Sequence, residues 1–163
     1  MNEEEEPPKI EPEIEPLIGP GFVQWGEGIW FGLSIGGVCW MLGTGLFLMS
    51  RKQFLLGVVP LIPYAVVMVM AFRLWWRRDR VLPFPALMGL LGTLGVSLPI
   101  VWYSILWFAS PKARFELGFP REPWQGILIS LIAPVLILFF ASLEWVYRKR
   151  GETAARSVTD EEP

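Results

Sequence analysis

The chain contains no histidine and only one cysteine. Histidine is the commonest metal ligand and the usual side chain that titrates near neutral pH. Haem ligation by a histidine pair, a histidine-based metal site and a serine–histidine relay are therefore impossible within this chain. The single cysteine, Cys39, cannot form an internal disulfide or a paired-cysteine redox site.

Charge is also missing from four long stretches, which are residues 28–50, 53–72, 81–111 and 123–143. Each stretch has at least 20 residues, which is about the length that a helix needs to cross the roughly 30 Å hydrocarbon core of a bilayer. The pattern predicts an all-α integral membrane protein. Its four transmembrane helices are expected to form an antiparallel bundle of two hairpins, surrounded by the lipid bilayer.

The charged residues divide the chain into one membrane domain and two tails. The predicted helices cover about residues 28–49, 54–76, 82–108 and 124–147 of a transmembrane domain at 25–147. Residues 1–24 are rich in glutamate and proline, and such a segment buries too little apolar surface to fold alone. We therefore expect a disordered acidic tail there, and a second disordered tail on the cytoplasmic side at 148–163.

Lysine and arginine predict the orientation of the bundle, because they accumulate on the cytoplasmic side of membrane proteins. With four spans, both termini lie on one side. That side holds nine basic residues, and the other side holds five. The count places the N- and C-termini in the cytoplasm and favours the plasma membrane, or cell inner membrane, as the location.

Small residues recur at helical spacing in the first and third spans. Gly28, Gly32 and Gly36 are spaced by four, Gly43 continues roughly the same face, and the third span has a set of its own: Gly89, Thr93 and Ser97. Small residues allow two helix backbones to approach closely in lipid. The pattern predicts a glycine-zipper contact between the first and third helices, either within one chain or between two chains.

Two ionisable residues lie just inside the ends of spans. Arg73 precedes the Trp75-Trp76 pair, and Glu144 precedes Trp145. Charges in membrane segments are costly and usually paired, so an interhelical ion pair between Arg73 and Glu144 is predicted. The alternative is that each side chain reaches independently to water.

Four prolines lie inside the predicted helices: Pro60, Pro63, Pro99 and Pro134. Proline kinks a helix and leaves a carbonyl without its donor. The kinks either improve packing between helices or open a small polar seam. Three roles are open for the basic residues of the 111–123 loop: binding headgroup phosphates, capping the bundle, or contacting a partner.

The remaining chemistry is sparse. No acidic or basic group lies at mid-membrane, and the sequence has no phosphate-binding glycine loop, metal-ligand spacing or nucleophile beside a base. It also lacks the basic face that binds nucleic acid. We expect no enzyme activity and no cofactor. The leading hypothesis is an accessory, assembly or structural subunit that packs against other membrane-protein subunits or against itself. The alternative is a small oligomeric transporter or channel that uses the proline-kinked helices as a polar path.

Overall fold

Every regular element in the described part of the chain is a helix. The computed structural model describes residues 21–119 and 121–159, with side chains as far as Thr153. Its helices are α1 (Glu27–Ser50), α2 (Phe54–Trp76), α3 (Pro83–Phe108), α4 (Pro111–Glu116), α5 (Pro123–Ser130) and α6 (Ile132–Thr159). Four helical segments are long and apolar enough to cross a membrane. The prediction of an all-α chain with four such segments is confirmed.

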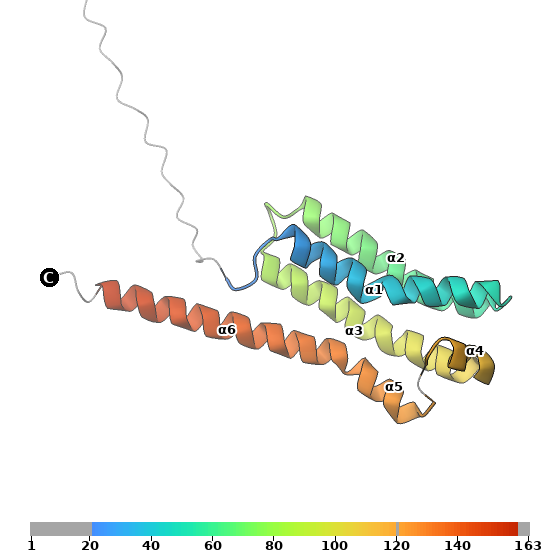
Figure 1. Ribbon diagram of the computed structural model, residues 1–163. Helices are drawn as coiled ribbons and strands as arrows, with labels where there is room; N and C mark the ends of the chain where they lie inside the picture. The colour runs from blue at the N-terminus through green and yellow to red at the C-terminus, as the bar shows by residue number, and fades with distance from the viewer. Residues whose placement is uncertain (1–20, 120, 160–163) are drawn as a thin grey trace, which may run out of the picture.

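The fourth apolar segment is broken at Leu131, whereas one continuous helix was predicted over 124–147. α5 ends and α6 begins on either side of Leu131, and the chain changes direction there (Figure 1). Pro134 lies three residues further on and has no N–H to donate to the carbonyl of Ser130. The helical hydrogen-bond ladder is therefore interrupted at this point.

α2 and α3 continue through their prolines. Pro60 and Pro63 lie inside α2, and Pro99 lies inside α3. Each leaves the carbonyl four residues earlier without its usual helical donor. Within α2, Pro63 therefore leaves the backbone carbonyl of Val59 without a helical N–H donor. The kinks expected at these three prolines stay a prediction.

The predicted tails differ from the structure at both ends. α6 continues to Thr159, so the prediction of disorder is wrong for residues 148–159, which extend the last helix instead. At the other end Val23, inside the predicted tail at 1–24, is buried and contacts α6. The remaining residues of both tails, 1–20 and 160–163, lie outside the described residues.

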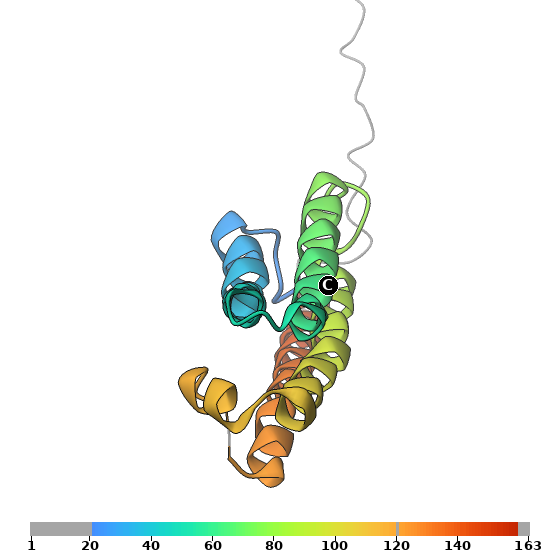
Figure 2. The same ribbon diagram turned by 90° about the vertical axis from the view of Figure 1, so that its right-hand side faces the viewer.

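Among the long helices, α1 packs on α2, α2 on α3 and α3 on α6. Figure 2 views the molecule from the end that carries the α1–α2 turn, α4 and α5. The chain reverses direction between successive long helices (Figure 1). A three-residue turn joins α1 to α2, and in it Lys52 has a φ of 63°. α5 also packs on α3. The short α4 lies at the far end of α3, near the turn between α1 and α2.

Two clusters of buried apolar side chains hold the helices together. The larger is shared by α1, α2 and α3 and includes Trp30, Met41, Val67, Leu87 and Leu90. The smaller lies nearer the turn and α4 and includes Leu48, Val101, Ile105 and Phe119. The fourth apolar segment contributes least, because only 11% of its most hydrophobic stretch is buried. Its apolar side chains therefore face outward, toward lipid or a partner.

α1 and α2 approach each other most closely at Gly45 and Gly57. A Cβ added to Gly45 would lie 2.9 Å from the carbonyl oxygen of Gly57, and a Cβ added to Gly57 would lie 2.9 Å from the carbonyl oxygen of Gly45. Each added carbon would also come within 2.7 Å of a side chain, that of Leu61 or Met49. These two glycines are thus required for the close contact between the two backbones.

The predicted small-residue contact between the first and third helices is wrong within one chain. A Cβ added to any of five glycines of the two stripes would meet no atom within 4 Å: Gly28, Gly32, Gly36, Gly43 and Gly89. α1 and α3 instead contribute large side chains to one buried cluster, such as Met41 and Leu90. The glycine face of α1 points outward, and a contact between two chains through it stays a prediction.

Candidate functional site

A groove of about 790 Å³ lies between α2 and α3. Pro63 lines it from α2, and Gly89, Thr93 and Ser97 line it from α3, together with further apolar side chains of both helices and Ser104. No charged residue is among its lining residues. The groove therefore brings together the α3 stripe and one of the four predicted kinks.

The hydroxyl groups in this groove are largely bonded to their own helix. Thr93 donates to the carbonyl oxygen of Gly89 at 2.9 Å, and Ser97 donates to that of Leu94 at 3.2 Å. These two hydroxyl groups therefore have no further hydrogen to donate to a polar ligand and keep only their acceptor capacity. Val59 also lines the groove, and its backbone carbonyl has no helical N–H donor because residue 63 is proline. Because most of the lining residues are apolar and none is charged, an apolar occupant still suits the groove better than a hydrated one.

The proline-rich seam predicted from the sequence is smaller in the structure. Pro63 lines the groove, whereas Pro60, Pro99 and Pro134 do not. Pro60 is fully buried, so its ring fills space between helices. The four prolines therefore do not converge on one polar path.

A buried carboxylate lies at the end of the molecule where the chain enters α1. Glu144 of α6 is only 3% exposed. Its Oε2 accepts the backbone N–H of Val23 at 3.2 Å, and its Oε1 accepts Nε of Arg148 at 2.8 Å. A Cβ added to Gly21 would overlap the carboxylate. We call residues 21–26, which fold over Glu144 and the neighbouring aromatic side chains, the N-terminal clasp.

Aromatic side chains attach the clasp to α1, α2 and the 77–82 loop. The indole N–H of Trp25 donates to the carbonyl oxygen of Val81 at 3.1 Å. Its ring lies 4.7 Å from that of Trp30 and 6.2 Å from that of Trp75, measured between centroids. The clasp thus connects α1, α2, α6 and the loop that precedes α3 at this end.

The predicted ion pair between Arg73 and Glu144 is wrong. The partner of Glu144 is Arg148, one turn later on the same helix, and the backbone of Val23 occupies its other oxygen. Arg73 is exposed at the end of α2, which suits the alternative that its side chain reaches to water. The spacing of four between Glu144 and Arg148 is a signal that could have identified the true pair. Nothing in the sequence indicates the contact with Val23.

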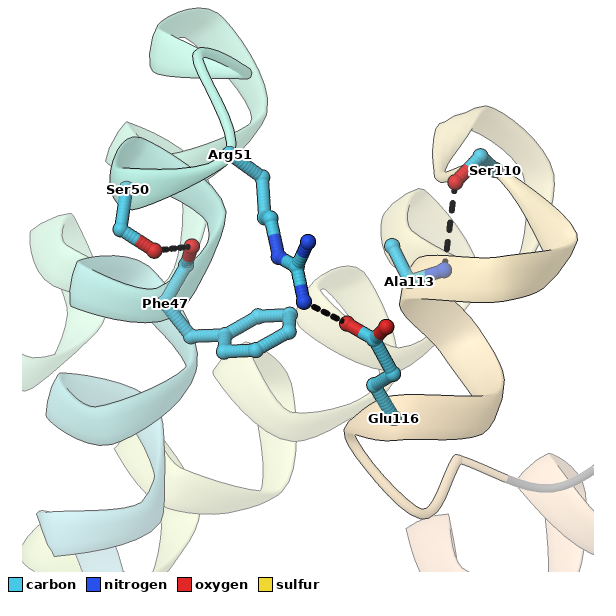
Figure 3. A network of polar contacts seen from close by, with 6 residues as sticks. All are labelled: Phe47, Ser50, Arg51, Ser110, Ala113 and Glu116. Atoms are coloured by element: carbon cyan, nitrogen blue, oxygen red, sulfur yellow. Dashed lines mark hydrogen bonds and ion pairs between the residues drawn. The ribbon is translucent and has the colours of Figure 1, made fainter.

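The opposite end of the molecule is closed by α4. Figure 3 shows Arg51, at the end of α1, extending to pair with Glu116 of α4. The guanidinium also lies 5.3 Å from the centroid of the Phe47 ring. Ser110 caps α4 by accepting the N–H of Ala113 at 3.2 Å. Of the three roles open for the 111–123 loop, these contacts favour capping the bundle.

Within the described ranges, no three histidine, cysteine, aspartate or glutamate side chains form a group that could hold a metal ion. Cys39 lies on the outer surface of α1, and its Sγ contacts the carbonyl oxygen of Gly36 at 3.6 Å. The chain matches no protein-family model, no curated protein and no solved structure.

Proposed function

We propose that this multi-pass membrane protein is a non-catalytic accessory, assembly or structural subunit that packs against other membrane proteins. Its four spans form an antiparallel bundle in the plasma membrane, or cell inner membrane, with both termini in the cytoplasm. The nine-to-five excess of basic residues on the terminal side supports that orientation. Its partners are further membrane-protein subunits or a second copy of itself.

The α2–α3 groove carries this proposal. Its lining includes Gly89, where an added Cβ would meet no atom within 4 Å. It also includes Ile62, Val96 and Ile100, which are 59%, 67% and 57% exposed. In lipid, helices associate mainly through close packing, and small residues at the contact favour it. An apolar groove lined partly by small residues is therefore suited to receive a helix of another subunit.

The transporter alternative receives less support from the same groove. A polar path needs groups that are free to bind a solute, and charged or unpaired polar side chains within a membrane usually supply them. Thr93 and Ser97 instead donate to carbonyls of α3. The groove has the character of a packing surface rather than of a conduit.

Site-specific photocrosslinking in the native membrane tests the proposal. A photoreactive residue replaces Val96 in the groove, and the matched control replaces Val135 of α6, which is 60% exposed and lies outside the groove. We expect Val96 to yield a crosslinked protein species, identified by mass spectrometry, that also co-purifies at fixed stoichiometry in mild detergent. The control is expected to react mostly with lipid. Recovery of lipid adducts alone from both positions, with a lone monomer in detergent, would contradict the proposal.

A further inference from the structure

The basic residues at the two ends of the molecule differ in what they contact. At the α4 end three of the five basic residues contact the protein itself, while Lys52 and Lys112 are exposed. Arg51 pairs with Glu116, Arg114 donates to the carbonyl oxygen of Leu106 at 2.6 Å, and Arg121 lies over the ring of Phe115 at 5.5 Å. These cations stabilise the α4 cap and have little capacity left for an external anion.

At the clasp end the basic residues face outward. The set lies in the last turn of α2, in the loop after it and in the part of α6 beyond Glu144, and it consists of Arg73, Arg77, Arg78, Arg80, Arg148, Lys149 and Arg150. All seven are exposed. In the part of the chain that the structure describes, Arg148 alone among them forms an ion pair, with Glu144. Asp79 and Glu152 lie among them in the sequence, so the set keeps a clear positive excess.

Two of these cations are held against tryptophan rings at the membrane boundary. Arg78 lies 4.7 Å from the ring centroid of Trp75, and Lys149 lies 5.2 Å from that of Trp145. Tryptophan prefers the headgroup level of a bilayer, and Trp145 is 64% exposed. The two rings belong to different helices, α2 and α6, and Arg78 lies just after the end of α2. Because tryptophan prefers the headgroup level, both cations are expected at the depth of the lipid phosphates.

We infer that this basic end binds the headgroups of anionic phospholipids. The cations are outward-facing, they sit at headgroup depth, and they outnumber the acidic residues around them. A basic residue near an anionic surface contributes about a fivefold gain in binding. The surface therefore selects anionic over zwitterionic lipids, and it does so more strongly than the α4 end, where, within the described residues, only Lys52 and Lys112 are exposed without a protein contact.

The test is lipid titration of the full-length protein in mild detergent, with bound lipids counted by native mass spectrometry. Phosphatidylglycerol is compared with phosphatidylcholine of the same acyl chains and with inorganic phosphate. We expect binding of phosphatidylglycerol that weakens strongly between about 0.05 M and 0.5 M salt, since salt screens exposed charges. Equal binding of the two lipids would overturn the inference. Displacement of bound phosphatidylglycerol by millimolar inorganic phosphate would overturn it as well.

Matched pairs of substitutions locate the site. Lys149→Gln with Arg150→Gln removes two charges from the basic end, and we expect phosphatidylglycerol to bind roughly 25-fold more weakly. Lys52→Gln with Lys112→Gln removes two charges from the α4 end and is expected to leave binding within about twofold. Equal losses in both variants would refute the assignment to one end. If the first variant fails to fold, Arg77→Gln with Arg80→Gln removes two other exposed charges from the basic end and tests the same assignment.

The acidic segment at 1–20 is a competing occupant, because it carries seven glutamates and joins the chain at the same end. A variant that lacks residues 2–16 separates the two cases. We expect it to bind phosphatidylglycerol at least as well as the full chain does. Anionic-lipid binding that appears only after this deletion would mean that the acidic segment occupies the site, and the inference would be wrong.

Discussion

Replacement of Gly45 by alanine is expected to destabilise the hairpin of α1 and α2. The added methyl would lie 2.6 Å from Cγ of Leu61 and 2.9 Å from the carbonyl oxygen of Gly57. The leucine side chain has room to rotate, but the carbonyl belongs to the backbone of α2. The two helices can accept the methyl only by moving apart along this contact.

The magnitude follows from two opposing effects. Overpacking of a tight interior typically costs about 1–3 kcal/mol, while alanine favours a helix over glycine by up to about 1 kcal/mol. Gly43→Ala, two residues away on the same helix, gains the same helix propensity without meeting any atom within 4 Å. The difference between the two variants therefore isolates the overpacking. We expect Gly45→Ala to be less stable than Gly43→Ala by about 1–3 kcal/mol.

The assay is unfolding in mixed micelles with increasing mole fraction of sodium dodecyl sulfate, followed by circular dichroism and tryptophan fluorescence. Gly57→Ala provides a second measurement from the other side of the same contact, and its loss should have the same sign and similar size. Indistinguishable stabilities of Gly45→Ala and Gly43→Ala would refute the assignment of the closest approach to Gly45.

Two further predictions concern the ends of the molecule. Glu144→Leu leaves the N–H of Val23 without an acceptor, so we expect the free energy of unfolding to fall by about 1–3 kcal/mol and the N-terminal clasp to be cleaved faster by protease. Glu144→Gln keeps one acceptor oxygen and should lose less stability. Equal losses of stability in the two variants would contradict the role of the carboxylate oxygen. A double-mutant cycle on Arg51 and Glu116 is expected to give a coupling energy of about 0.2–1 kcal/mol that decreases with salt, because both side chains are partly exposed. A coupling energy that is unchanged at high salt would count against an ion pair.

The sequence predicts the membrane-spanning segments well because their signal is the absence of charge over a fixed length. The observed limits of α1, α2 and α3 lie within one residue of the predicted ones. The break at Leu131 is harder to place. Pro134 indicates that the helix is interrupted nearby. The residue at which α5 ends also depends on how α5 packs on α3.

The orientation of the helices about their own axes could not be predicted. In a soluble protein the polar face of a helix points to water, so periodicity shows which face is buried. In lipid both the interior and the surroundings are apolar. The stripe at Gly28, Gly32 and Gly36 therefore marks a face without showing whether it points inward, and in the structure it points outward. The true contact, at Gly45 and Gly57, breaks the spacing that drew attention to the stripe.

The error over Arg73 has a different cause. The predicted pair joins charged side chains at the ends of two different helices. In the structure, Glu144 instead has its partners on its own helix and in the segment that precedes α1. The backbone N–H of Val23 carries no side-chain signature. Contacts made by the main chain of an irregular segment are visible only once the fold is known.

The N-terminal clasp has a consequence for the order of biogenesis. Its hydrogen bond to Glu144 joins residues that are 121 positions apart in the chain. Because a chain emerges from the ribosome N-terminus first, residues 21–26 are synthesised before any span, yet their carboxylate acceptor arrives with the last one. Nascent chains that stall after α3 have no acceptor for this bond. Closure of the clasp is thus a late event that reports complete insertion, and its absence distinguishes an unfinished chain from a finished one.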